Sequence, residues 1–387
     1  MNKPITEYAL TDVTLFAAPF GFGPLGKAMA LAHKFEDRGY TVKVLTDDVG
    51  LKIVKASGLN GHMYAYKQTM DLADLSTDLA ISCMDISTPI IKSGIPLVLF
   101  DSLLWLRGSW EHLPKYNEDI YIAQRFFIEP PEIVVEKIKE HLHMVDAVLP
   151  RSSAASHGIM QGKKVVLYPG GLKSPHLALE YQEQYLSWVI DAITPALKLN
   201  DISLSDFTII LPPQILDTQL AADLQKKGIE IKSKQKDLGA IISNARAFII
   251  APGIETMLEG TAQGKIPLYL PAYIAPHIPQ LVELRKAGVG IELCPSFNDR
   301  FMTYEANGEN MGVLSKDILH YNQEELYQDK YQQEAINVLD EFLKHPRLAQ
   351  NPYPLGKNGA DQVVDILEPV LNPDFFNEKV SERVMQL

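Results

Sequence analysis

The chain has 387 residues, 46% hydrophobic and 22% charged, which is the balance of an ordinary globular protein of two or three domains. Its 36 basic and 48 acidic side chains give a formal charge of −12, which disfavours non-specific binding to nucleic acid or anionic lipid. The two cysteines, Cys83 and Cys294, exclude a disulfide scaffold and a structural zinc site built on cysteines. Without a long apolar run or a signal-peptide core, we expect a cytoplasmic protein with no membrane span and no nucleic-acid partner.

The first part of the chain predicts alternating strands and helices. An apolar strand over residues 13–17 leads into a loop rich in glycine and proline. A helix follows over residues 27–38, where apolar side chains recur at spacings of three and four. The further elements are strands at 41–46, 79–83, 96–100 and 146–150 and a helix at 133–143. Strands that are apolar throughout are typical of a parallel sheet covered on both faces.

The same alternation restarts after a junction near residues 158–163. The predicted strands are 164–168, 207–211, 229–232, 247–251 and 266–270, and the predicted helices are 177–197, 214–227, 256–263, 279–287 and 323–342. Two such series predict an α/β protein with two Rossmann-like domains facing each other across a cleft. We expect the domains at residues 1–160 and 161–358, with a C-terminal helix in 359–387 packing back towards the first.

Two segments carry a resemblance to a known family. The loop at residues 20–27 has the sequence FGFGPLGK, and residues 251–259 have the sequence APGIETMLE. They are similar to the G-x-G-H-x-x-P loop and the H-G-G-x-G-T-x-x-E stretch of GT-B sugar-nucleotide glycosyltransferases. The chain also has a fainter likeness to the cytosylglucuronate synthase group. The resemblance implies transfer of a sugar from a nucleotide diphosphate, held by the second domain, to a small-molecule acceptor held by the first.

The resemblance also implies a set of donor-binding residues. A glycine before a helix lets a diphosphate approach the positive end of the helix dipole. Glu259 matches the acid that accepts hydrogen bonds from the ribose, although an ordinary surface helix residue is the alternative. His277 and Gln280 fall near the place of the family's D-Q pair, and His277 could equally be a surface histidine. The donor-site candidates are Gly170, Gly171, Gly253, Thr256, Glu259, His277 and Gln280.

The first loop departs from the family pattern. The general-base histidine of the family aligns with Pro24, and proline cannot accept a proton. Lys27 is unfavourable at a helix start, which suggests pairing with a donor phosphate or an acceptor carboxylate, with a solvated lysine as the alternative. The candidate residues of this loop are Gly21, Gly23, Gly26 and Lys27.

A base must therefore come from elsewhere, or be absent. Asp85 and Asp101 follow predicted strands on the acceptor side and are the catalytic candidates, with a helix N-cap as the alternative for both. Trp105 could stack on an acceptor ring and Arg107 could pair with a carboxylate, unless both serve the core. No D-x-D motif occurs, so we expect no metal and no cofactor beyond the nucleotide-sugar co-substrate.

Three other functions stay open. A non-hydrolysing sugar-nucleotide epimerase shares the architecture, and an inactive nucleotide-sugar-binding partner subunit would explain the missing histidine. A dehydrogenase is the third, because residues 21–26 satisfy G-x-G-x-x-G and Asp47 lies where a ribose-binding acid would sit. A homodimer is compatible with the sequence.

Overall fold

The computed structural model describes residues 12–371 except 20–21, 65–67, 86–87, 108–117, 150–163, 171–177, 234–237, 303–310, 326–327 and 352. Its first domain contains a seven-stranded sheet whose paired strands all run parallel. In spatial order the strands are β3 (Gly61–Met63), β2 (Thr41–Thr46), β1 (Asp12–Ala17), β5 (Leu79–Cys83), β7 (Leu97–Asp101), β8 (Ile120–Gln124) and β9 (Leu142–Val145). A separate two-stranded sheet joins β4 (Met70–Asp71) and β6 (Ile90–Ile91).

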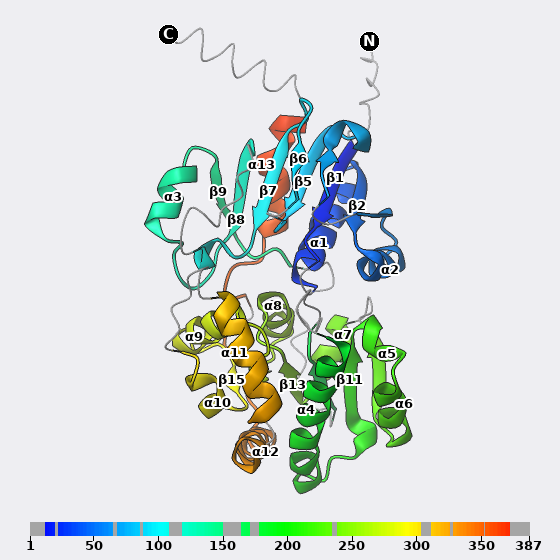
Figure 1. The fold of residues 1–387 in the computed structure, drawn as a ribbon, viewed down its shortest axis with the longest axis vertical. Coiled ribbons are helices and arrows are strands. Elements are labelled where there is room, and N and C mark those ends of the chain that lie inside the picture. Colours follow the sequence, from blue (N-terminus) through cyan, green and yellow to red (C-terminus); the bar gives the residue numbers. More distant parts are fainter. Residues whose placement is uncertain are drawn as a thin grey trace, which may run out of the picture.

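The helices of this domain include one from the far end of the chain. They are α1 (Gly23–Asp37), α2 (Asp48–Ala56), α3 (Glu132–Ile138) and α13 (Gly359–Leu371). Helix α13 packs against α1 (Figure 1), and its apolar side chains join the core of the first domain. Ion pairs from Lys34 to Asp361 and from Arg38 to Asp365 lie along the α1–α13 contact. The amide of Gly359 also donates to the carbonyl of Ala147 at 3.2 Å.

The second domain has a six-stranded sheet, again parallel at every pair. Its spatial order is β12 (Glu230–Ser233), β11 (Phe207–Leu211), β10 (Val165–Tyr168), β13 (Ala247–Ile250), β14 (Pro267–Tyr269) and β15 (Ile291–Glu292). Its helices are α4 (Leu179–Leu199), α5 (Pro213–Leu216), α6 (Gln219–Lys226), α7 (Leu238–Ser243), α8 (Ile254–Ala262), α9 (His277–Lys286), α10 (Pro295–Asp299), α11 (Met311–Glu324) and α12 (Asp329–Lys344).

The two domains meet at the carboxyl ends of the strands in their sheets. Helix α1 follows the carboxyl end of β1, helix α8 follows the carboxyl end of β13, and the two helices are in contact. Figure 1 shows the first domain above and the second below, with α8 and the lower end of α1 near the junction between them. Trp105 of the first domain is part of the apolar core of the second. The structure confirms the expected GT-B plan, in which two Rossmann-like domains face each other through the carboxyl ends of their strands.

Four predicted elements were wrong. One is the helix expected at residues 323–342, because α11 ends at Glu324 and α12 begins only at Asp329. The helix expected at residues 133–143 ends at Ile138, because residues 142–145 pair with β8 as the edge strand β9. No strand forms over residues 146–149, and β8 itself was not predicted. The helix expected at residues 214–227 is split into α5 and α6, since Thr218 takes an extended conformation at the start of α6. The expected domain boundary near residue 160 lies outside the described residues.

No helix in the described part of the chain is both long enough and apolar enough to cross a bilayer.

Candidate functional site

Three neighbouring strands of the second sheet end at the same edge. Strands β10, β13 and β14 are adjacent and parallel, so the segments that follow them lie side by side. These segments begin at Pro169, Ala251 and Leu270. Helices α8 and α9 start from the second and third of them. The edge therefore gathers two helix N-termini, where positive dipole ends and free amides favour an anion.

The predicted glycines at this edge differ in what the fold demands of them. Gly170 has φ +72°, a conformation that favours glycine, and a Cβ there would lie 3.5 Å from both Ala251 Cβ and Tyr273 Oη. Gly253 precedes α8 in ordinary extended conformation, and a Cβ would meet no described atom nearer than 3.9 Å. The described residues therefore do not require glycine at residue 253, since they leave a Cβ there without a close neighbour. Gly171 lies outside the described residues.

Helix α8 carries one threonine and two buried acidic side chains in its first two turns. Thr256, half-buried, and Glu259, only 7% exposed, are three residues apart and share a face of the helix. The alternative that Glu259 is a surface residue is wrong, because its side chain is buried. Glu255, which is 8% exposed, lies one turn before Glu259. Burial of two carboxylates this close together is unfavourable unless positive groups offset it, and the helix N-terminus supplies such an offset.

The start of α9 carries two buried polar side chains with unused hydrogen-bonding atoms. His277 is 5% exposed and Gln280 is 6% exposed. Neither His277 Nδ1 nor Gln280 Oε1 has a hydrogen-bond partner among the described residues. The two residues are three apart, so they lie on one face of the helix. Two buried groups with spare hydrogen-bonding capacity are expected to find a partner, and the surface alternative for His277 is wrong.

The stability of the protein is expected to fall on acidification because of His277. Burial lowers the pKa of this side chain from 6.5 to about 3. Below about pH 6.5 the unfolded chain binds a proton that the folded protein binds only near pH 3, so the free energy of unfolding decreases as the pH falls between these values. The contribution is at most about 1.4 kcal/mol per pH unit. Urea denaturation at pH 7, 6, 5 and 4 measures the free energy of unfolding, which should depend less on pH in His277→Gln than in the wild type. Equal slopes in the two proteins would contradict a lowered pKa for His277.

Tyrosine and asparagine side chains fix the segment between β14 and α9. Tyr273 Oη donates to the carbonyl of Pro169 at 3.3 Å, which links this segment to the end of β10. Tyr185 Oη donates to the carbonyl of Pro271 at 2.6 Å. The amide of Ala272 donates to Asn298 Oδ1 at 3.0 Å. Sequence analysis missed Tyr273, although an aromatic residue shortly after a buried strand was a usable signal.

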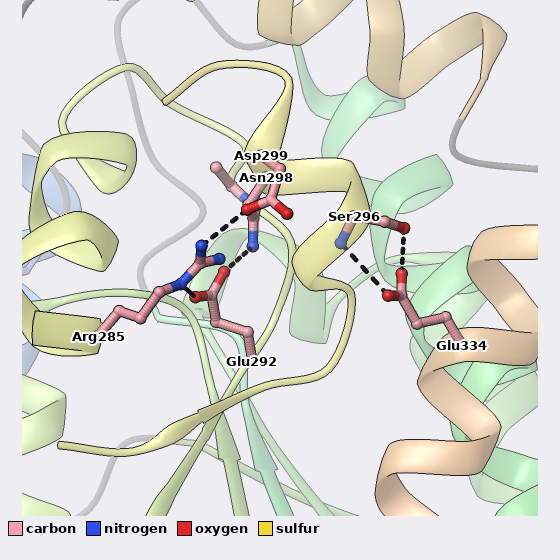
Figure 2. A network of polar contacts seen from close by, with 7 residues as sticks. Arg285, Glu292, Ser296, Asn298, Asp299 and Glu334 are labelled. Atoms are coloured by element: carbon pink, nitrogen blue, oxygen red, sulfur yellow. Dashed lines mark hydrogen bonds and ion pairs between the residues drawn. The ribbon is translucent and has the colours of Figure 1, made fainter. Parts of the chain in front are cut away.

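A polar network holds Asn298 in place (Figure 2). Asn298 is fully buried and donates from Nδ2 to Glu292 Oε2 at 2.8 Å. Glu292 in turn accepts from Arg285 Nε at 2.6 Å, and the same guanidinium reaches Asp299 at 2.7 Å. Because Arg285 belongs to α9, the network ties the far end of that helix to the loop that Asn298 clamps. Contacts at the end of α9 and in the segment before it therefore both help to hold this helix in position.

Asp85 and Asp101 lie at the carboxyl edge of the first sheet, at the ends of the adjacent strands β5 and β7. Both are fully buried. Asp85 accepts from the hydroxyls of Tyr64 and Thr88 and from the amide of Thr88. Hydrogen bonds within the chain therefore hold this carboxylate between Tyr64 and Thr88.

Asp101 is held still more completely. Its carboxylate accepts from Arg107 Nε at 3.1 Å, Tyr121 Oη at 2.7 Å and the amide of Leu103 at 2.7 Å. Arg107, predicted to pair with an acceptor carboxylate, pairs with this internal one. Burial, together with the Asp101 carboxylate, raises the pKa of Tyr121, so its hydroxyl stays a donor. The base and acceptor roles of these residues stay predictions.

Trp105 is 8% exposed and already stacked on an internal ring. Its ring lies 4.3 Å from that of Phe126 at an angle of 18°. Both rings pack against the core of the second domain. The residue therefore contributes to the contact between domains, which was the structural alternative for it, and its predicted stacking on an acceptor is not tested.

The start of α1 lies against helix α8. A Cβ on Gly26 would fall 1.7 Å from Glu255 Oε1, and one on Gly23 would fall 4.0 Å from Glu255 Oε2. Lys27 is buried, and its Nζ donates to the carbonyl of Val148 at 2.6 Å, so the alternative of a solvated lysine is wrong. Gly21 lies outside the described residues. Sequence analysis missed Glu255, although it stands where the H-G-G-x-G-T stretch has its last glycine.

The dehydrogenase alternative depends on the first glycines and on Asp47. The Glu255 carboxylate lies beside Gly26, the last glycine of that fingerprint. Asp47, the proposed ribose acid, caps α2 by accepting from the amide of Gly50 at 2.8 Å. The described residues contain no cluster of three or more metal-ligating side chains of the His, Cys, Asp and Glu types. That no metal is needed stays a prediction.

No family model matches the sequence, and no curated protein matches it. Solved structures similar to the chain include MurG of Acinetobacter baumannii, at 14% identity and a TM-score of 0.46 over 92% of this chain and 99% of that one. UGT89C1 of Arabidopsis thaliana complexed with UDP is 12% identical, with a TM-score of 0.47 over 92% and 99%. The calicheamicin glycosyltransferase CalG4 is 12% identical, with a TM-score of 0.47 over 94% and 100%.

Proposed function

We propose that the chain is a glycosyltransferase that moves a sugar from a nucleotide diphosphate to a small-molecule acceptor without a metal. The donor binds at the carboxyl edge of the second sheet. Its diphosphate approaches the start of α8 beside Gly170 and Gly253, with Thr256 on the same turn. Its ribose hydroxyls donate to Glu259. Its sugar lies at the start of α9, against His277 and Gln280.

One observation carries this proposal: the pair of unused polar atoms at the start of α9. His277 Nδ1 and Gln280 Oε1 are buried without a partner in the described structure. They lie at the start of the helix that follows β14, and β14 is next to β13, which leads into α8. A neutral imidazole and an amide can exchange hydrogen bonds with sugar hydroxyls, which both donate and accept. Because burial lowers the pKa of His277 to about 3, its ring is neutral near pH 7 and keeps one nitrogen that can accept a hydrogen bond from a sugar hydroxyl. Helix dipoles then stabilise the leaving diphosphate, as a metal would elsewhere.

The acceptor lies against the facing edge of the first sheet in this proposal. Asp85 and Asp101 are the carboxylates at that edge, and either would have to exchange an internal hydrogen bond for one to the acceptor. An acceptor whose reacting atom is already a good nucleophile needs less help from a base, which suits a chain with Pro24 at the usual base position. Nothing in the site favours the epimerase alternative.

A thermal-shift screen against UDP-, GDP-, dTDP- and ADP-sugars, with NAD(H) and NADP(H) for comparison, tests the donor class. A ligand that binds only the folded protein stabilises it by about 2.7 kcal/mol at a hundredfold excess over its dissociation constant. One nucleotide sugar should raise the melting temperature while the dinucleotides do not. A shift with a dinucleotide alone would overturn the proposal in favour of a redox role.

Replacing Glu259 by glutamine should weaken binding of that nucleotide sugar about 10- to 100-fold, because a hydrogen bond to a charged acceptor is worth about 1.5–3 kcal/mol. Isothermal titration measures the change. Glu283→Gln on the neighbouring helix α9 is the matched control, since its side chain pairs only with Lys286 among the described contacts. Equal affinities in the wild type and Glu259→Gln would remove Glu259 from the ribose site.

A further inference from the structure

Glu255 is a residue of the second domain whose carboxylate lies against a helix of the first. A Cβ built on Gly26 of α1 would lie 1.7 Å from Glu255 Oε1, 2.3 Å from Cδ and 2.4 Å from Oε2. The side chain therefore fills the space that a side chain at residue 26 would occupy. Since only 8% of Glu255 is exposed, its carboxylate is enclosed at the contact between α1 and α8.

Both helices at this contact lack a side-chain cap of their own. The N-cap residues, Phe22 for α1 and Gly253 for α8, make no side-chain capping hydrogen bond. The first turn of α1 contains no acidic residue, and that of α8 contains only Glu255. A negative charge stabilises a helix N-terminus, so one carboxylate serves two helices that belong to different domains.

The contact with Glu255 accounts for the glycine at residue 26. It lies inside the first turns of α1, where its amide donates to the carbonyl of Phe22 at 2.8 Å. Alanine would be the better helix former at such a position, by about 1 kcal/mol. The three nearest described atoms that a Cβ would meet belong to the Glu255 carboxyl group. Glycine at residue 26 is thus matched to a carboxylate from the other domain.

We propose that Glu255 is a latch between the domains: its carboxylate holds the start of α8 against the start of α1, and an incoming phosphate displaces it. The first half of this proposal concerns the chain alone. The second half rests on the proposed function, because it assumes that a diphosphate uses the N-terminus of α8. A carboxylate and a phosphate cannot share the same positive helix end, so the ligand must move Glu255 and thereby release α1.

The latch can be tested without any ligand by hydrogen exchange. The amides of Gly23 and Leu25 lie in the first turn of α1, where no intrahelical acceptor exists. Exchange of the peptide that contains them is compared in the wild type, Glu255→Ala, Gly26→Ala and the double variant. Glu180→Ala is the matched control, because Glu180 is also a first-turn acid, in α4, but is exposed.

We expect exchange at this peptide to become about tenfold faster in each single variant, with no further increase in the double variant, because both changes release one contact. Glu180→Ala should leave it unchanged. Far-ultraviolet circular dichroism checks that the variants are folded. Unchanged exchange in Glu255→Ala, or effects that multiply in the double variant, would overturn the latch.

Binding of inorganic pyrophosphate by isothermal titration tests the displacement. Affinity should rise about fivefold or more in Glu255→Ala and in Gly26→Ala, since the competing carboxylate is gone or displaced. Faster exchange without a gain in affinity would overturn the displacement and keep the latch. Failure of every variant to bind either pyrophosphate or a nucleotide sugar would overturn the displacement together with the proposed donor site, while the exchange experiment decides the latch by itself.

Discussion

Replacing Asp101 by alanine is expected to lower the free energy of unfolding by about 3–5 kcal/mol, the effect of removing one partner of a buried ion pair. Asp101 is fully buried, and its partner Arg107 is left with an uncompensated charge when the carboxylate is removed. The hydroxyl of Tyr121 and the amide of Leu103 lose their acceptor in the same change. The lower free energy of unfolding therefore has two causes: one cation loses its partner, and two hydrogen-bond donors lose their acceptor.

Urea denaturation followed by tryptophan fluorescence measures this effect. Asp101→Asn is the informative companion, because asparagine keeps the shape and one acceptor oxygen while removing the charge, and its loss should be smaller. A loss under about 1 kcal/mol in Asp101→Ala would be that of an ordinary surface change. It would contradict the structural role and favour a carboxylate that is available to an acceptor.

Replacing Gly290 by alanine is expected to destabilise the second domain by about 3 kcal/mol or more. Its φ of +91° lies in the region that side chains rarely adopt, which costs about 1–3 kcal/mol. A Cβ would also lie 2.2 Å from Tyr269 Cε2 and 2.9 Å from the carbonyl oxygen of Pro267, and overpacking of this kind costs a further 1–3 kcal/mol or so. Tyr269 ends β14, so the change disturbs the strand that leads to the segment before α9.

Gly288→Ala provides a matched control two residues away. Gly288 has φ +66°, but a Cβ there would meet no described atom within 4 Å. We therefore expect its replacement to lower the free energy of unfolding only by the cost of the positive φ. Thermal or urea denaturation of both variants separates the clash from the conformational strain. Equal decreases in stability in the two variants would show that Tyr269 moves away from the new Cβ without destabilising the protein.

The sequence predicted the regular elements best where an apolar run ends at polar or glycine residues. The predicted strands at 41–46, 79–83 and 207–211 coincide with β2, β5 and β11. The prediction failed at β9, whose residues continue a helical pattern and become a strand only by pairing with β8. Local periodicity cannot reveal a pairing that the rest of the sheet imposes.

The same limit applies to the site. Parallel strands bring their carboxyl ends to one edge, so the gathering of Gly170, Gly253 and His277 could be expected from their places after strands. Whether Asp101 faces a substrate or an arginine could not, because that depends on how the chain after β7 turns back. The contact between Glu255 and Gly26 joins two domains, and no local pattern records it.

Hydrogen exchange with and without a saturating nucleotide sugar, the one selected by the thermal-shift screen, tests the central claim most directly. A donor at the carboxyl edge of the second sheet should slow exchange in the segments that follow β10, β13 and β14, through the first turns of α8 and α9. Protection confined to the first loop and the start of α1, or no change at the three segments, would contradict the account.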